Sequence, residues 1–164
     1  ATLTHERGML GDPNQAGTRL EAIARLMQEE TIDGTTLMEN PVMRDRLLQL
    51  QSRVLAMQFN GLRLLTAGLK KQDVTMAKLI VKLQGCELNH ALAALAIDAM
   101  GELGLLYHDS PRLRAGGAWQ RSYMFDLGMI IGGGTAQIQK NIIAERGLGM
   151  PREPKPAQTE GGAR

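Results

Sequence analysis

The sequence predicts an all-α fold, an antiparallel four-helix bundle followed by one extra short helix at its C-terminal end. Only 3% of the 164 residues are aromatic, whereas methionine occurs 10 times and leucine and alanine are abundant, a composition that favours helices over sheets. Apolar residues recur at helical spacing in several long segments. Many glycines are clustered between these segments, where they interrupt helices: Gly116-Gly117, Gly132-Gly133-Gly134 and Gly161-Gly162.

Composition also limits the class of protein. The 43% hydrophobic content fits one globular domain, expected over residues 1–150, with a flexible tail at 151–164. The longest apolar run, residues 91–97, is far shorter than the ~20 residues of a membrane-spanning helix, so we expect no membrane span and a cytoplasmic protein. The formal net charge of +2 indicates no cationic surface for nucleic acid. The single cysteine, Cys86, excludes an internal disulfide.

The first two helices have clear boundaries. A helical pattern follows the first 14 residues, and its apolar positions are Leu20, Ile23, Ala24 and Met27. The segment TIDGTT, residues 31–36, ends it, because Asp-Gly and clustered threonines favour turns. Asn40 and Pro41 start the second helix, since asparagine caps helices well and proline is tolerated at the first helical position. Gly68, followed by two lysines, indicates its end.

The remaining helices are predicted in the same way. The third begins near Asp73, a suitable N-cap, and runs to about Gly101 or Gly104, a length of ~45 Å. A loop follows, and the fourth helix spans residues 119–131. Three glycines interrupt the chain there, and Thr135 caps a last short helix over residues 136–146. No strand is predicted.

The segment GGGTAQIQKNIIAERGLGMP, residues 132–151, carries the most chemical information. Its glycines allow positive φ angles and close backbone approach, and the helix that starts at Thr135 has free N–H groups that favour anions. Gln137 and Gln139 add amide donors beside this terminus. A phosphate, a nucleotide edge or a polarised carbonyl would fit there. On these residues alone, a glycine-capped surface turn without a ligand remains the alternative.

The same segment closely resembles the last block of the flavin-dependent acyl-CoA dehydrogenases, which commonly reads like GGTxEIQrniIAERvLGLP. Four stretches are in register: GGT (133–135), QIQ (137–139), IIAER (142–146) and LG (148–149). ENPVMRDRLLQLQ, residues 39–51, resembles the start of the second long helix in that family's carboxy-terminal bundle, mostly in bacterial members. The resemblance implies that the chain is this helical domain, and that the family's amino-terminal helical domain and middle β-domain are absent from it.

This resemblance implies an oxidoreductase of lipid metabolism, as in fatty-acid β-oxidation. Such an enzyme removes an α-proton from an acyl-CoA thioester and passes a β-hydride to FAD, with electron-transfer flavoprotein as the expected electron acceptor. The family's bundles pack against each other, which implies a homo-oligomer (dimer or homotetramer) or a hetero-oligomer. The isolated fragment is expected to be inactive, because most of the acyl-CoA pocket belongs to the other domains.

The resemblance also predicts where the catalytic base lies. Most members place a glutamate directly before the Gly-Thr of the glycine loop, and here that position is Gly133, which cannot accept a proton. A minority places the base directly before an arginine near the start of this domain, where the chain has Glu6 and Arg7. We therefore expect Glu6 to be the base and Arg7 to orient the substrate, with Gly133 on the opposite wall of one chamber. A solvated surface glutamate without a catalytic role is the alternative.

For the cofactor, the resemblance assigns FAD contacts to the side chains of Thr135 and Gln137 and to the backbone of Gly133 and Gly134. No metal site is expected, because His5 and His108 have no partners at ligand spacing. The third histidine, His90, lies on an apolar helix face and is expected to pack in the core or an interface.

Two segments depart from the family pattern. The family's Arg-x-x-Phe-Gly motif, whose arginine reaches the FAD pyrophosphate of a neighbouring subunit, is replaced by ETIDGTT at residues 30–36. The family's Gln-x-x-Gly-Gly-x-Gly segment reads DAMGELG here, with Asp98 in place of glutamine and Glu102 in place of glycine. An ionised aspartate cannot donate a hydrogen bond to a phosphate. These departures leave two other interpretations open: a non-catalytic structural subunit of a hetero-oligomer, and a helical interaction module without a cofactor.

Overall fold

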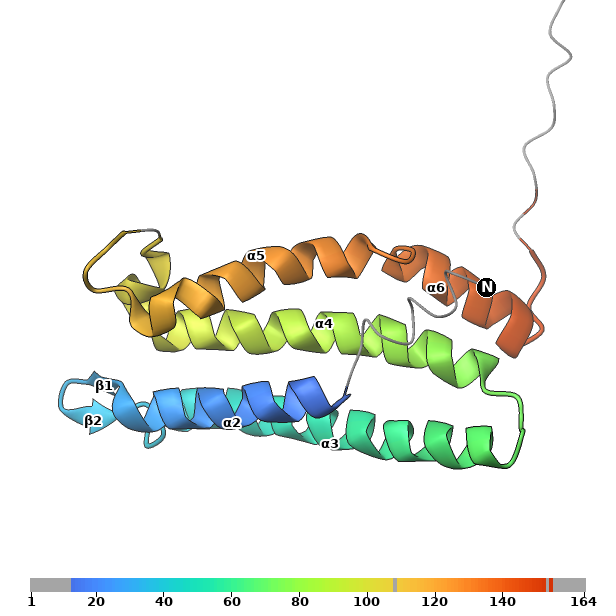
Figure 1. Ribbon diagram of the computed structural model, residues 1–164, viewed down its shortest axis with the longest axis horizontal. Helices are drawn as coiled ribbons and strands as arrows, with labels where there is room; N and C mark the ends of the chain where they lie inside the picture. Colours follow the sequence, from blue (N-terminus) through green and yellow to red (C-terminus); the bar gives the residue numbers. More distant parts are fainter. Residues whose placement is uncertain (1–12, 108, 153, 155–164) are drawn as a thin grey trace, which may run out of the picture.

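The computed structural model describes residues 13–107, 109–152 and 154, and it confirms the predicted all-α bundle with an extra short helix. Successive long helices run antiparallel, and the short helix continues the line of the fourth (Figure 1). The helices are α2 (Pro13–Glu29), α3 (Pro41–Leu69), α4 (Thr75–Ala99), α5 (Ala118–Ile131) and α6 (Ala136–Ile142). Within the described ranges, none of the helices combines the length and the apolar character needed to cross a lipid bilayer.

Helix α4 is the central element of the bundle. It lies between α2 and α3 on one side and α5 and α6 on the other (Figure 1), and it contacts all four helices. More than half of its 25 residues are buried, which is typical of a helix enclosed by others. The core around it draws on α2, α3 and α4: Ile23, Met27, Leu50, Val54, Leu88, Leu92 and Leu95.

The start of α3 confirms the predicted cap. The Asn40 side-chain oxygen accepts hydrogen bonds from the backbone N–H groups of Val42 at 3.0 Å and Met43 at 3.1 Å. Pro41 occupies the first turn, where its missing N–H leaves no bond unmade. Asn40 therefore satisfies two donors that the helix geometry leaves without an acceptor.

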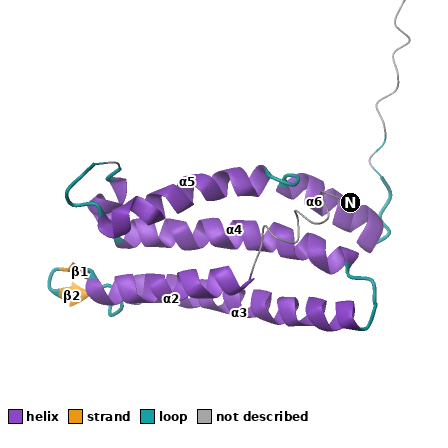
Figure 2. Cartoon of the chain, in the orientation of Figure 1, coloured by secondary structure: helices purple, strands orange, loops and turns teal. Residues whose placement is uncertain are grey.

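The prediction that the chain contains no strand was wrong in one place. Residues Thr31–Ile32 (β1) and Thr35–Thr36 (β2) pair as a very short antiparallel hairpin, drawn in orange in Figure 2. Asp33 and Gly34 both have positive φ angles, 51° and 79°. Two such residues in succession give the turn whose twist matches paired strands, so the predicted turn also closes a hairpin.

Both ends of α4 differ from the prediction. The N-cap position is Val74 rather than Asp73, although the Asp73 carboxylate accepts a hydrogen bond from the Thr75 N–H at 2.9 Å. This bond lowers the pKa of Asp73. At the other end the α-helix stops at Ala99, and a 3₁₀ turn, η1 (Gly101–Leu105), follows. The α-helix cannot continue because Gly101 adopts a φ of 54°, in the left-handed region.

The last helix is also shorter than predicted. Helix α6 ends at Ile142, and the chain continues as a π-helical turn, η3 (Ile143–Gly147), in which the Leu148 N–H donates to the Ile143 carbonyl at 3.1 Å. At the end of α3, Lys71 rather than a glycine adopts the left-handed conformation, with φ of 55°. The end of α3 was thus predicted to within one residue, whereas the α-helical part of the last helix ends at Ile142 rather than Arg146.

Helix α3 leaves a row of large apolar side chains in contact with solvent. Only four of its 29 residues are buried. We call the exposed set the α3 apolar row: Leu48, Leu55, Phe59, Leu62, Leu65 and Leu69, with exposed fractions from 46% to 77%. Apolar rows of this size mark surfaces that another domain or chain covers.

The Asn40 cap gives a direct test of this description. Replacing Asn40 by alanine should lower the free energy of unfolding by about 1 kcal/mol, because two backbone donors lose their acceptor. Asn40→Asp keeps the acceptor and serves as the control. Urea unfolding followed by far-ultraviolet circular dichroism measures both, and equal stability of Asn40→Ala and the unmodified protein would contradict the cap.

Candidate functional site

The predicted site lies in the turn between α5 and α6. We call residues 132–134 the glycine turn. Gly133 and Gly134 have φ angles of 63° and 107°, which confirms that these positions need glycine. Thr135 is the N-cap of α6, as predicted, and its hydroxyl oxygen accepts a hydrogen bond from the Ile138 N–H at 3.4 Å. Thr135 therefore joins the glycine turn to the first residue of α6.

Two backbone hydrogen bonds hold the glycine turn to α5. The Gly132 N–H donates to the Gly128 carbonyl at 2.9 Å, and the Gly134 N–H donates to the Ile131 carbonyl at 3.2 Å. Both bonds tie the turn to the end of α5. The two carbonyls of Gly133 and Gly134 are instead satisfied by side chains from other positions.

One of these side chains is Lys82, which the sequence analysis did not identify. It lies on α4 and is only 1% exposed. Its ammonium donates to the Ile130 carbonyl at 3.0 Å and to the Gly134 carbonyl at 2.5 Å. The positive charge thus lies at the C-terminal end of α5, where the helix dipole favours it. The only sequence signal is one lysine within the apolar pattern of residues 79–86.

The second side chain is Gln139, which is fully buried. Its Nε2 donates to the Gly133 carbonyl at 3.0 Å, so it faces the turn rather than a ligand, contrary to the expectation that it adds a free donor. Its Oε1 has no hydrogen-bond partner among the described residues. Gln137, by contrast, is exposed, and it remains the glutamine available to a ligand.

The groups left available at the turn fit a flavin. Thr135 is partly exposed and Gln137 is exposed, so a hydroxyl and an amide are accessible beside the turn. Helix geometry also leaves the first N–H groups of α6 without intrahelical acceptors. Hydrogen-bond donors grouped in this way suit the carbonyl oxygens and ring nitrogens along the polar edge of a flavin. The donor set therefore matches the cofactor that the family resemblance implies.

The predicted base lies outside the described residues. Glu6 and Arg7 belong to residues 1–12, so the chamber that they are expected to share with Gly133 stays a prediction. His5 and His108 also lie outside the described part of the chain. Within it, no group of three or more histidine, cysteine, aspartate or glutamate side chains is arranged to hold a metal ion.

An ion pair connects α2, the first described helix after the predicted base, with α5, the helix before the glycine turn. Arg19 on α2 donates to the Asp126 carboxylate on α5 at 2.7 Å. Asp126 is 3% exposed, and the Arg19 side chain is 18% exposed. The pair ties α2 to α5. The sequence analysis did not identify it, because the two residues are 107 positions apart.

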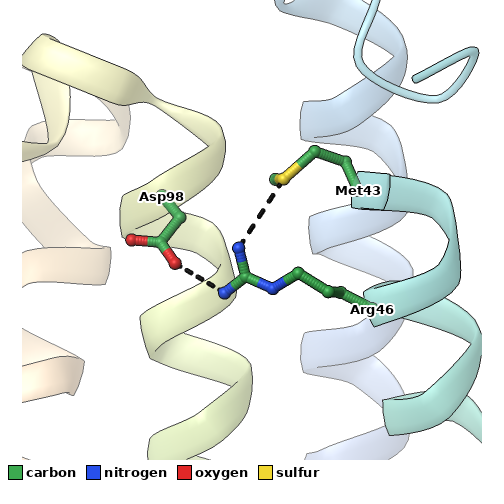
Figure 3. A network of polar contacts seen from close by, with 3 residues as sticks. All are labelled: Met43, Arg46 and Asp98. Carbon is green, nitrogen blue, oxygen red and sulfur yellow. Dashed lines mark hydrogen bonds and ion pairs between the residues drawn. The ribbon is translucent and has the colours of Figure 1, made fainter. Parts of the chain in front are cut away.

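The end of α4 does not fit the flavin contact found in the family. Asp98 accepts from Arg46 of α3 at 2.5 Å, and the same guanidinium lies 3.7 Å from the Met43 sulfur (Figure 3). Both charged side chains are about half exposed. The carboxylate at the position of the family's glutamine is thus engaged by a cation of its own chain. It has no proton to donate to a phosphate or a flavin carbonyl.

His90 and Cys86 have packing roles. The His90 ring lies 4.6 Å from the Tyr123 ring, between α4 and α5, as predicted for a packed histidine. Its Nδ1 is buried without a hydrogen-bond partner in the described part of the chain. Cys86 is 2% exposed, and burial raises the pKa of its thiol, so the unreactive protonated form dominates at neutral pH.

Comparison with known proteins shows the family of the chain. The family model described as "Acyl-CoA dehydrogenase, C-terminal domain" matches residues 1–148. The chain is 32% identical over 157 residues to acyl-CoA dehydrogenase IpdE1 of Mycobacterium tuberculosis, covering 94% of this chain and 38% of that protein. Identity to IpdE1 of Mycolicibacterium smegmatis is also 32%, over 156 residues, with 94% and 36% covered. The chain therefore spans less than two fifths of the length of these curated relatives.

Solved structures share the fold. The steroid ACAD Tcur3481-Tcur3483 superposes with a TM-score of 0.79 at 21% identity, covering 93% of this chain and 39% of that one. The ChsE4-ChsE5 complex of Mycobacterium tuberculosis superposes with a TM-score of 0.78 at 24% identity, with 93% and 40% covered. At these identities the similarity establishes the bundle architecture.

The two ion pairs are expected to differ in strength. Asp126→Ala should lower the free energy of unfolding by about 2 kcal/mol, because it leaves the largely buried Arg19 without its partner. Asp98→Ala removes a half-exposed pair and should cost about 0.5 kcal/mol, since solvent screens that interaction. Chemical denaturation of the two variants under identical conditions provides the comparison. Equal losses would show that the Arg19–Asp126 pair is not buried in solution.

Proposed function

We propose that this chain forms part of an enzyme that dehydrogenates an acyl-CoA thioester between its α and β carbons. The chain belongs to the acyl-CoA dehydrogenase family and corresponds to the C-terminal domain of its members. The observation that carries the proposal is the glycine turn capped by Thr135, built from the GGT-x-QIQ segment that matches the family. The whole enzyme needs further domains for the rest of its acyl-CoA pocket.

FAD, when bound, supplies the acceptor for the β-hydride. In this chain, the Thr135 hydroxyl and the Gln137 amide would hold the polar edge of the flavin, beside the backbone of Gly133 and Gly134. These donors would also stabilise the reduced flavin, whose ring oxygens and nitrogens carry more negative charge than those of the oxidised form. We further propose electron-transfer flavoprotein as the partner that reoxidises the enzyme, and a place for the reaction in β-oxidation-type degradation.

Glu6 is the proposed catalytic base. The α-proton of a thioester is weakly acidic, so a carboxylate must lie close to it in a site that excludes water and raises the pKa of the base. The proton passes to the Glu6 carboxylate, and the electrons of the α C–H bond form the new double bond as the β-hydride leaves. Arg7 orients the thioester, and Gly133 leaves space where most family members carry the base.

A second candidate function is a structural subunit in a hetero-oligomer. The Arg46–Asp98 ion pair favours it, because Asp98 stands where the family's Gln-x-x-Gly-Gly-x-Gly segment has its glutamine. The segment of the missing Arg-x-x-Phe-Gly motif forms the β1–β2 hairpin instead. Two of the similar solved structures carry two protein names each, ChsE4-ChsE5 and Tcur3481-Tcur3483. The α3 apolar row is a surface that such a partner would cover.

Substituting Glu6 tests the first function. In the full-length protein that carries this domain, Glu6→Gln should leave FAD binding unchanged and should slow reduction of the flavin by acyl-CoA at least a thousandfold. Anaerobic stopped-flow absorbance with straight-chain and steroid side-chain acyl-CoA thioesters measures the rate. Glu21→Gln, an exposed acid on α2, is the control and should react normally. Normal bleaching of the flavin by Glu6→Gln would exclude Glu6 as the base.

Co-expression distinguishes the two functions. If the full-length protein is an enzyme by itself, it purifies yellow and acyl-CoA bleaches it. If it is a structural subunit, it purifies colourless alone and yields a yellow complex only with a second acyl-CoA dehydrogenase subunit. A colourless product in every combination would contradict both candidates and favour a helical interaction module. Flavin absorbance per mole of each chain is the measurement.

A further inference from the structure

The strongest unexplained feature of the molecule is the buried ammonium of Lys82. A lysine that is 1% exposed is unusual, because a charge removed from water must be compensated by the protein. Its two acceptors in the described part of the chain, the carbonyls of Ile130 and Gly134, belong to one short segment. Lys82 therefore joins the central helix α4 to the last turn of α5 and to the glycine turn at the same time.

The glycine turn needs such an external constraint. Glycine loses more conformational freedom on folding than any other residue, and three glycines stand in succession here. Within the turn itself, the bond from the Gly134 N–H to the Ile131 carbonyl, at 3.2 Å, encloses Gly132 and Gly133. The side-chain bonds from Lys82 and Gln139 therefore contribute much of the order at Gly133 and Gly134.

We propose that Lys82 is a positioning residue of the flavin site, which holds the carbonyl of Gly134 and thereby fixes the direction in which Thr135 and Gln137 present their donors. Lys82 itself does not touch the ligand, because it is 1% exposed and backbone carbonyls hold two of its three N–H donors. The identity of the ligand rests on the proposed function. The hydrogen bonds from Lys82 to the carbonyls of Ile130 and Gly134 do not depend on that ligand.

The test compares Lys82→Met with the unmodified full-length protein, in complex with its partner subunit if one is needed for flavin binding. Methionine keeps most of the volume of lysine and removes its charge and donors. We expect amide hydrogen exchange over residues 130–137 to accelerate at least tenfold and the Kd for FAD to rise at least tenfold. At saturating FAD, the visible circular dichroism of the bound flavin should also change, because its donors are displaced.

Leu92→Ala is the matched control for general destabilisation. Leu92 is fully buried on the same helix and belongs to the core with α2 and α3 rather than to the glycine turn. This variant should lower the melting temperature while leaving the Kd for FAD and the flavin spectrum unchanged. If Lys82→Met does not fold, Lys82→Gln replaces it, because glutamine is neutral and shorter yet keeps an N–H donor.

The outcomes separate the two claims. Unchanged exchange, Kd and flavin spectrum in the Lys82 variant would overturn the positioning role and leave the proposed function intact. Equal loss of FAD affinity in the Lys82 and Leu92 variants would overturn it as well, since the effect would be general. An unmodified protein that binds no FAD, alone or with a partner, would contradict the proposed function, and the exchange comparison would still decide whether Lys82 holds the turn.

Discussion

The enclosure of α4 by the other helices is the constraint on which the rest of the arrangement depends. Because more than half of its residues are buried, a polar side chain on this helix must find its partners in neighbouring elements. Lys82 finds them in the carbonyls at the end of α5 and in the glycine turn. Not every group on α4 is satisfied, since Asn89 Oδ1 and His90 Nδ1 are buried without partners among the described residues. The position of the glycine turn thus follows from the packing of a helix far from it in sequence.

A second, independent contact fixes helix α5. The Arg19–Asp126 ion pair ties α2 to α5, while Lys82 ties α4 to the end of α5. Two other helices, α2 and α4, therefore hold α5 before the chain enters the glycine turn. The donors that the proposed function assigns to FAD would then be ordered before the cofactor binds. The half-exposed Arg46–Asp98 pair contributes no comparable rigidity, since solvent screens it.

Local chemistry explains why the fold was predictable and the site only in part. Asn40, Thr135 and the glycines at 133 and 134 act on residues within a few positions, so their roles were evident in the sequence. Lys82 and its acceptor Gly134 are 52 positions apart, and only packing brings them together. The end of α4 was misplaced because nothing in the sequence distinguishes a glycine that continues a helix from one, such as Gly101, that adopts a positive φ. Gln139 was misjudged for a similar reason, because helical phase alone does not show which amide faces inward.

The α3 apolar row links the folding of this domain to its surroundings. The row runs along about 32 Å of one helix, and exposing this apolar surface to water costs free energy. A surface that covers the row stabilises the folded domain, and a separate chain would do so in proportion to its free concentration. Where the covering surface belongs to a separate chain, the melting temperature depends on protein concentration as well as on sequence, and dilution lowers it.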